Sequence, residues 1–286
     1  MELTELRKQI NEVDAELLPL FLRRMKLAEE VAEVKKKQGL PVYNAARERE
    51  ILSRVSENAG DMGEYARLFY NHLFELSRSR QIQLMECTDH GLIPPESAEP
   101  FPQSAAVACL EAEGENSGIA AGKAFRSFDL IQMKTIDAVF QAVESGMCRF
   151  GMLPMENSAL GSVKKVYDQL RSQRCSIVRS VRVDTESSFI RFIVIEKSPK
   201  VYAGSDRISL MFSLPDAPGS LNRIVSMFSC RDINIVKLEL RCTDETHFEY
   251  YMDIDASAGN PAVRQLINHF SLELPAFAFL GAYQEV

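Results

Sequence analysis

The stretch that decides the fold of the first domain is Leu6–Val34, LRKQINEVDAELLPLFLRRMKLAEEVAEV. Its apolar residues recur at alternating steps of four and three, which is typical of a helix that packs lengthwise against another helix. The positions of this seam are Leu6, Ile10, Val13, Leu17, Leu20, Arg24, Leu27, Val31 and Val34. The helix is too long for a small monomeric domain, so we predict a dimeric helical bundle.

One cation interrupts the apolar seam. Arg24 stands in its middle, and a guanidinium buried without a partner costs several kcal/mol. Lys35 follows about 16 Å further along the helix axis and only about 20° around it, so both cations look along nearly one face. We therefore predict an anion-binding core inside the bundle. Taken alone, an arginine in such a seam is more often part of a structural ion pair, and that alternative stays open here.

Two further helices complete the predicted bundle. The second begins at Asn44, a favourable N-cap residue, and runs to about Ala59. The third extends from about Gly63 to Met85. Thr4 is expected to cap the first helix, and Gly39 is expected to end it.

These helices carry charged and polar groups that can share one site. The candidate cations are Arg7, Arg24, Lys35 and Arg47, and the polar groups facing them are Glu48, Ser77 and Gln81. Arg7 lies about 100° around the helix from Arg24, so it cannot easily serve the same site in one subunit, and an antiparallel dimer could bring it to the partner's site. No nucleophile stands beside a base, and no histidine is placed for proton transfer. The set suits binding of a polyanion and stabilisation of its charge, without a covalent or acid–base step. Ser77 and Gln81 alone can also be hydrogen-bonded core residues.

Composition limits the classes of function. A chain of 286 residues suggests about two domains or three small ones. A net charge of −7 argues against nucleic acid or an anionic membrane as the main partner. The six cysteines include no CxxC pair and the four histidines are scattered, so we expect neither a metal site nor a cofactor. With no signal peptide and no apolar run near 18 residues, we expect a cytoplasmic protein.

Beyond residue 86 the sequence pattern changes twice. Residues 87–103 are rich in proline and are predicted to form a linker. Residues 104–200 alternate short apolar runs with helical stretches, which predicts a small α/β layer. Residues 205–286 give the order strand, helix, strand, strand, helix, strand, and this βαββαβ order is the ferredoxin-like plan.

Residues 1–86 resemble the all-helical chorismate mutase domain. The segments LRKQINEVDAELL, RRMKLAEEVAEVKKKQG, VYNAARERE and ELSRSRQ carry this resemblance. It implies an intertwined homodimer that rearranges chorismate to prephenate without a cofactor. Asn44 stands where the family usually has aspartate, and asparagine still caps the helix.

The resemblance also implies a role for each polar residue. Arg24, Arg47, Ser77 and Arg7 of the partner subunit would hold the two carboxylates of chorismate. Lys35 and Gln81 would hydrogen-bond the ether oxygen, where negative charge grows as the C–O bond breaks. Glu48 would accept a hydrogen bond from the substrate hydroxyl.

The middle part resembles one lobe of the dehydratase domain in bifunctional chorismate mutase–prephenate dehydratases. LPMENSALGSVKKVYDQL, Leu153–Leu170, is similar to the lobe that carries a PxENSxxGSV loop. Three departures follow. The early GPEG-type turn reads LEAEG at Leu110–Gly114, and the catalytic Thr-Arg-Phe reads Ile190-Arg191-Phe192, without the hydroxyl. Only six residues separate Val183 from Ile190, where the family inserts a second lobe, so we expect a truncated domain without dehydratase activity.

The last part resembles the ACT domain that senses phenylalanine in these enzymes. Pro218-Gly219-Ser220-Leu221 matches the glycine-rich turn before its first helix, and the usual Glu-Ser-Arg-Pro reads ELRC from Glu239. The resemblance implies that L-phenylalanine would be bound by Gly219, Ser220, Leu221, Asn234 and Glu239. Two of the four ELRC positions differ, so a purely structural dimerisation module remains an alternative.

The sequence thus predicts a multi-domain α and α/β protein that forms a homodimer or a higher homo-oligomer. Its parts are a mutase bundle (1–86), a linker (87–103), a single dehydratase-like lobe (104–200) and an ACT domain (205–286). Two alternatives remain. One is a bifunctional enzyme that still makes phenylpyruvate, and the other is an amino-acid-sensing regulatory protein. The intact cationic set at 7, 24, 35 and 47 argues against the second.

Overall fold

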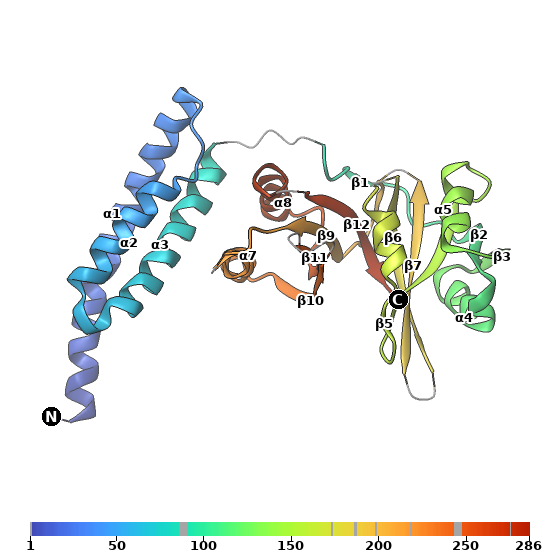
Figure 1. Ribbon diagram of the computed structural model, residues 1–286, viewed down its shortest axis with the longest axis horizontal. Helices are drawn as coiled ribbons and strands as arrows, with labels where there is room; N and C mark the ends of the chain where they lie inside the picture. The colour runs from blue at the N-terminus through green and yellow to red at the C-terminus, as the bar shows by residue number, and fades with distance from the viewer. Residues whose placement is uncertain are drawn as a thin grey trace. The chain divides into compact units, whose positions relative to one another are not determined.

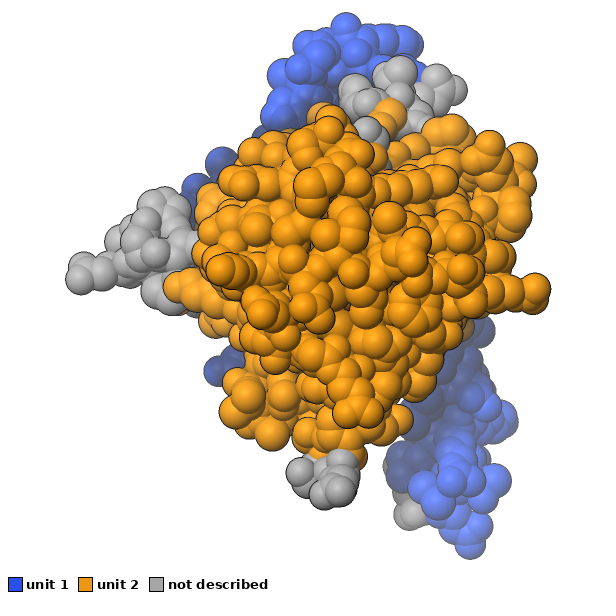
Figure 2. Space-filling model, turned by 90° about the vertical axis from the view of Figure 1, so that its right-hand side faces the viewer, with its two compact units in different colours: residues 1–88 blue, residues 89–286 orange. Residues whose placement is uncertain are grey.

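The computed structural model describes residues 2–85, 91–172, 174–185, 188–197, 199–217, 219–242, 248–274 and 276–286. The chain divides into two compact units, residues 1–88 and residues 89–286, coloured blue and orange in Figure 2. Within the described ranges, every helix is too short or too polar to cross a membrane.

Unit 1 is a three-helix arrangement (Figure 1). Its helices are α1 (Leu3–Gln38), α2 (Ala45–Asn58) and α3 (Gly63–Leu84), with the 3-10 turn η1 (Gly60–Met62) before α3. Both α1 and α2 pack against α3. The three predicted helices are therefore confirmed, together with their order.

The helix ends agree with the sequence prediction except at the start. Asn44 caps α2, because its Oδ1 accepts a hydrogen bond from the backbone N–H of Arg47 at 3.1 Å. Gly39 ends α1 with a φ of +66°, a conformation that glycine adopts without strain. The predicted cap at Thr4 is wrong. The helix begins earlier, so Thr4 lies inside the first turn, and Glu2 occupies the N-cap position without a side-chain hydrogen bond.

Most of the apolar seam of α1 remains uncovered within one chain. Val13 is 64% exposed and Leu20 is 62% exposed, and the other apolar members of the seam are exposed as well. The buried residues of α1 are Ala28 and Ala32, in its C-terminal half. A long exposed apolar stripe of this kind is typical of a protein–protein interface.

Unit 2 is built on one mixed sheet, flanked by helices. Its main strands are β2 (Ser104–Leu110), β3 (Ser127–Met133), β4 (Phe150–Asn157), β5 (Gly161–Ser162), β6 (Cys175–Asp184), β7 (Phe189–Lys197), β9 (Arg207–Ser213), β10 (Asn234–Cys242), β11 (Phe248–Asp255) and β12 (Ala278–Glu285). Its helices are α4 (Gly114–Ala124), α5 (Ile136–Glu144), α6 (Lys164–Leu170), α7 (Ser220–Ser229) and α8 (Pro261–Glu273), and η2 (Glu111–Glu113) is a 3-10 turn. The strand order is β10-β11-β9-β12-β6-β7-β4-β2-β3, with β5 paired to β4.

The sheet joins two parts of the sequence that were expected to form separate domains. Strand β12 pairs antiparallel with β9 of the ferredoxin-like part and parallel with β6 of the preceding α/β part. Gly281 lies at this junction, and a Cβ there would stand 2.1 Å from the carbonyl oxygen of Ile177. Glycine therefore permits the close approach of the two strands.

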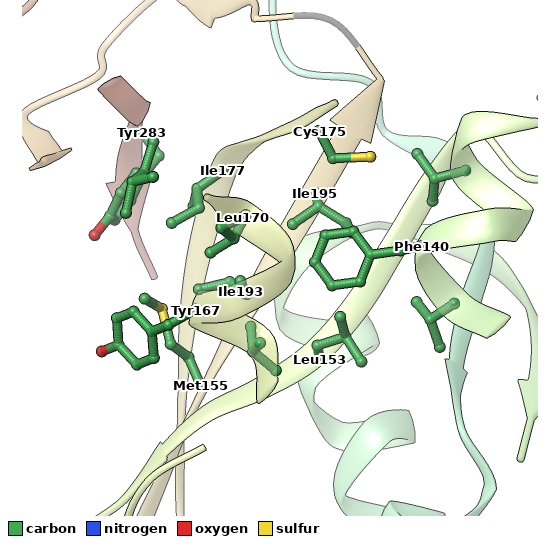
Figure 3. Close-up of a cluster of buried hydrophobic side chains, with 14 of the residues drawn as sticks. Phe140, Leu153, Met155, Tyr167, Leu170, Cys175, Ile177, Ile193, Ile195 and Tyr283 are labelled. Atoms are coloured by element: carbon green, nitrogen blue, oxygen red, sulfur yellow. The ribbon is translucent and has the colours of Figure 1, made fainter. Parts of the chain in front are cut away.

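The α/β part, residues 104–197, has a core between its helices and the sheet. Figure 3 shows Phe140 from α5, Leu170 from α6, Leu153 from β4 and Ile193 from β7 in one buried cluster. The structure adds α4, which the sequence analysis does not predict. Its buried positions are small residues, such as Ala120 and Ser117, and these do not form a stripe of large apolar side chains.

The ferredoxin-like part follows the order β9-α7-β10-β11-α8-β12, which confirms the predicted βαββαβ plan. Helices α7 and α8 contribute Ile224, Phe228 and Phe270 to the second core, where they meet Leu210 and Met252 of the sheet. The opposite face of the sheet lies against the α/β part, since Tyr251 of β11 contacts Tyr167 of α6 with ring centroids 4.4 Å apart. The two parts thus form one compact unit.

The proline-rich segment after residue 90 is packed onto unit 2. Ile93 is 1% exposed and Phe101 is 5% exposed, the latter against the rings of Phe125 and Phe150. Strand β1 (Glu96–Ser97) pairs with β8 (Val201–Tyr202). Residues 91–103 of the predicted linker therefore pack as part of unit 2, and residues 87–90 lie outside the described residues. Proline content predicts the absence of long helices and strands, and it carries no information about burial.

Strands β6 and β7 form a hairpin. They pair antiparallel along their length, from Cys175 opposite Lys197 to Asp184 opposite Phe189. Residues 185–188 are the whole connection between the two strands. At the point where the family inserts a second lobe, only these four residues separate the two strands.

Candidate functional site

A pocket in unit 1 collects residues from all three helices. Its volume is about 260 Å³. Seven of the eight residues predicted for the mutase site line it: Arg24, Lys35, Asn44, Arg47, Glu48, Ser77 and Gln81. The eighth, Arg7, is exposed on α1 about 25 Å before Arg24 along the helix and is not part of the lining. Its predicted contribution to a partner's pocket stays a prediction.

Arg24 is held by uncharged acceptors. Its Nη1 donates to the carbonyl oxygen of Leu73 at 3.1 Å and to Oγ of Ser77 at 2.5 Å. Ser77 in turn donates to the same carbonyl at 2.6 Å. Burial lowers the pKa of Arg24 from its ordinary value, because desolvation disfavours the charged form. An anionic ligand in the pocket would offset this cost, since the acceptors present carry no charge.

Lys35 enters the pocket from the last turn of α1. Its Nζ donates to the carbonyl oxygen of Val42 at 2.5 Å. Burial lowers the pKa of Lys35, and the positive charge of Arg78 lowers it further, while Glu48 acts in the opposite direction. The ammonium group is thus a hydrogen-bond donor in the lining of the pocket.

Arg78 is the pocket residue that the sequence analysis missed. Its Nη1 forms an ion pair with Oε1 of Glu48, and its guanidinium lies 5.4 Å from the ring centroid of Tyr43. A signal was present, because Arg78 and Gln81 are three residues apart and therefore share a helix face. Its ion-pair partner is on another helix, so no local sequence pattern indicates the contact.

Arg47 and Gln81 complete the polar lining of the pocket, and they differ in their hydrogen bonding. Nη1 of Arg47 donates to both carboxylate oxygens of the exposed Glu50, each at 2.8 Å. Oε1 of Gln81 is buried and has no hydrogen-bond partner among the described residues. A buried amide of this kind is costly unless something binds to it.

The chemistry available in this pocket is electrostatic. Its charged lining groups are four cations, Arg24, Lys35, Arg47 and Arg78, and one carboxylate, Glu48. The lining contains no histidine or cysteine that could transfer a proton or attack a substrate. The described residues also contain no cluster of histidine, cysteine, aspartate or glutamate able to hold a metal ion. The arrangement can bind a small dianion and donate hydrogen bonds to charge that develops on it.

In unit 2, the residues of the dehydratase-like motifs are engaged by the ferredoxin-like part. Arg191 is 6% exposed, and its Nη1 lies 2.8 Å from Oδ2 of Asp253 on β11. Burial lowers the pKa of Arg191, but the charges of Asp253, Tyr283 and Tyr167 and the hydrogen bond to Asp253 together outweigh burial, so that the pKa is raised overall. Glu156 lies 3.3 Å from Nε of Arg191 and 3.0 Å from Nζ of Lys237 on β10. Ile190 is buried among apolar residues, at the position where the family places a threonine.

The five residues predicted to bind phenylalanine are not gathered in one chain. Gly219 has a φ of +85° and caps α7. Leu221 packs against the core that α7 and α8 form with the sheet. Glu239 instead faces the α/β part, where it accepts a hydrogen bond from Ser162 and lies 3.3 Å from Lys237. Asn234, at the start of β10, donates to a carboxylate oxygen of Asp255 at 3.0 Å. Ser220 begins α7, and Pro218 of the same turn lies outside the described residues.

The chain matches two protein families, one within each unit. Residues 6–82 match the family Chorismate mutase type II, and residues 107–205 match the family Prephenate dehydratase. A bifunctional chorismate mutase/prephenate dehydratase from Aquifex aeolicus is 23% identical over 369 aligned positions, covering 99% of this chain and 98% of that protein. One from Enterobacter agglomerans is 33% identical over 184 residues, covering 62% of this chain and 45% of that protein. The second family match favours a dehydratase domain over the loss expected from the sequence.

Solved structures of two prephenate dehydratases resemble the described fold. The one from Streptococcus mutans is 27% identical with a TM-score of 0.53, and covers 63% of this chain and 98% of its own. The one from Arthrobacter aurescens, in complex with L-Phe, is 18% identical with a TM-score of 0.52, and covers 63% of this chain and 89% of its own. Together with the two family matches, the likeness to the Streptococcus mutans structure confirms the predicted fold class, a helical region followed by an α/β region with a ferredoxin-like end.

Proposed function

Because the chain carries a chorismate mutase type II domain and a prephenate dehydratase domain, the pair found in the bifunctional chorismate mutase/prephenate dehydratase family, we propose that it rearranges chorismate to prephenate. The observation that carries the proposal is the pocket of unit 1, in which seven predicted residues meet with an excess of positive charge. Chorismate is a dianion of a size that such a pocket can hold. An amino-acid-sensing protein without enzymatic activity would not need this set.

The reaction is an intramolecular Claisen rearrangement, in which the ether C–O bond breaks as a C–C bond forms. No atom enters or leaves, so the protein needs to orient the substrate and stabilise charge on the ether oxygen. In this proposal Lys35 and Gln81 donate to that oxygen. Glu48 accepts a hydrogen bond from the substrate hydroxyl. Arg24, oriented by Ser77, binds one carboxylate.

The remaining carboxylate contacts come from Arg47 and from Arg7 of the partner subunit. Arg7 is remote from the pocket in its own chain, and the seam of α1 that runs between it and Arg24 is exposed. A second copy packed on this seam would cover the apolar surface and bring its own Arg7 to the pocket. We therefore propose a homodimer as the active form.

A second candidate function is prephenate dehydratase, and it is favoured by the family match at residues 107–205 and by the bifunctional relatives. Three observations oppose it. The relative from Aquifex aeolicus aligns over 369 positions, so at least 83 of them have no residue in this chain of 286. Only residues 185–188 separate β6 from β7, where the family inserts a second lobe. Arg191 forms a buried ion pair with Asp253. To bind prephenate instead, Arg191 would have to leave Asp253 unpaired, and breaking such a pair costs about 3–5 kcal/mol. We propose that unit 2 does not dehydrate prephenate.

We expect both the purified protein and its Ile190→Thr variant to convert chorismate to prephenate and to stop there. Loss of water and CO₂ from prephenate requires the substrate to be screened from solvent and held from two sides. A restored hydroxyl supplies one group on one side only. Chromatographic measurement of prephenate and phenylpyruvate, after all chorismate is consumed, checks this. The same sample acidified to convert prephenate chemically serves as the positive control. Phenylpyruvate above the uncatalysed background would establish the bifunctional alternative.

We also propose that two ferredoxin-like parts bind L-phenylalanine where they meet, near Gly219–Leu221 and Asn234. The dehydratase solved with L-Phe supports this proposal at the level of fold. At 100 times its Kd, a ligand stabilises a protein by about 2.7 kcal/mol, so millimolar L-phenylalanine should raise Tm by several degrees. Calorimetric titration measures binding directly. D-Phenylalanine and the Asn234→Ala variant are the controls, and neither should give the response. Absence of heat and of a Tm shift with the L-form would leave this part as a scaffold.

A further inference from the structure

Arg78 and Glu48 form a contact that the proposed mutase chemistry does not yet explain. Arg78 follows Ser77 on α3, and its side chain is 10% exposed. Its Nη1 is bonded to Oε1 of Glu48 on α2, which is 21% exposed. The guanidinium also lies over the ring of Tyr43, from the loop before α2. The cation is thus held by Glu48 of α2 and by Tyr43 of the preceding loop.

We propose that Arg78 is a positioning residue of the chorismate mutase site, which fixes the Glu48 carboxylate for the substrate hydroxyl. This inference rests on the proposed mutase function. A glutamate side chain has several low-energy rotamers. A charge-assisted hydrogen bond from a guanidinium that is itself packed on an aromatic ring selects one of them.

A direct contact between Arg78 and a substrate carboxylate is the competing explanation. The geometry favours the indirect role, because Nη1 of Arg78 already donates to Glu48 and the guanidinium lies over the ring of Tyr43. Arg24 and Arg47 remain for the substrate carboxylates, and neither has a carboxylate of the pocket as its partner. The two explanations differ in whether the effect of Arg78 depends on the charge of Glu48.

Arg78 also acts on Lys35. The charged groups around Lys35 are Arg24 on its own helix, Glu48 and Arg47 on α2, and Arg78 on α3. Arg78 lowers the pKa of Lys35, and Glu48 raises it. Removing Arg78 takes away a repulsive positive charge and leaves Glu48 less neutralised, so both changes raise the pKa of Lys35. The alkaline decline of kcat/KM should therefore move to higher pH in the absence of Arg78.

A double-mutant cycle on the full chain tests the proposal. Arg78→Met should lower kcat/KM for chorismate about 20-fold in the wild-type background, the range for a hydrogen bond to a charged group. In the Glu48→Gln background the same change should cost less than about threefold, because a neutral amide does not need a cationic partner. Arg78→Lys keeps the charge without the planar fork and should give an intermediate loss with little movement of the alkaline limb.

Arg80→Met is the matched control. Arg80 lies on the same helix, and its Nε forms an ion pair with Glu29 at 2.6 Å, with both side chains substantially exposed. Its loss should change kcat/KM by less than about twofold. Equal losses from Arg78→Met in both backgrounds, or an alkaline limb that does not rise, would overturn the proposal. Failure of the wild-type protein to consume chorismate would instead contradict the proposed function, so the two failures are distinguishable.

Discussion

Replacement of Lys35 by alanine is expected to lower kcat for chorismate rearrangement about 10²- to 10³-fold, with little change in KM. The ether oxygen of chorismate carries little charge in the ground state and gains negative charge as the C–O bond breaks. A donor directed at this atom therefore contributes mainly in the transition state. Loss of chorismate absorbance, followed at several substrate concentrations, separates the two kinetic constants.

Two variants frame this result. Lys37→Ala removes an exposed lysine from the same turn of α1 and should be kinetically silent. Arg24→Ala should raise KM as well as lower kcat, because a carboxylate contact exists before the reaction starts. If Lys35→Ala retained nearly wild-type turnover, the assignment of the pocket would be wrong.

Lys35 should also determine how kcat depends on pH. Lys35 must be protonated to donate to the ether oxygen with a full charge, and burial lowers its pKa below the ordinary value of 10.5. The proton is therefore lost at a lower pH than from an exposed lysine. We expect kcat to fall on the alkaline side below pH 10.5, and this decline should be absent from the residual activity of Lys35→Ala.

The parts of the fold that were predictable are those with local signals. The seam of α1, the N-cap at Asn44 and the βαββαβ order can all be read from periodicity and turn residues. The junction of β12 with β6 cannot, because it pairs Gly281 with Ile177 across about a hundred residues of sequence. Helix α4 was missed for another reason, since its buried face consists of small residues. Long-range pairing and close packing of small side chains leave little trace in a local pattern.

The candidate site shows the same division. Residues of α1 and α3 could be assigned to one pocket because they share helix faces, and the resemblance to chorismate mutases supplied their roles. Arg78 was not predicted because its role depends on a contact with Glu48, which lies thirty residues earlier on another helix. Glu239 was grouped with Gly219 from motif similarity, but alternation along β10 directs its side chain to Ser162 of the α/β part. A motif places residues near one another in sequence and does not determine which face of a strand they occupy.

The contribution of Arg7 gives the second large effect. Arg7→Ala should lower kcat/KM about 100-fold or more, because it removes a charged contact to a substrate carboxylate. In one chain, however, Arg7 lies about 25 Å from Arg24 along α1 and outside the pocket. A residue so placed can act on the substrate only from a second subunit.

Mixing two inactive variants tests this arrangement without any structural assumption about the interface. In a heterodimer of Arg7→Ala and Lys35→Ala chains, the pocket with intact Lys35 receives Arg7 from the other chain and is complete, while the second pocket lacks both groups. After unfolding and refolding of an equimolar mixture, half of the dimers are mixed and one of their two sites is intact. About one quarter of wild-type activity should return. If Arg7 acted within its own chain, every site in the mixture would lack one group and no activity would return. Mixing Arg24→Ala with Lys35→Ala is the control, because these residues share one pocket and cannot complement each other.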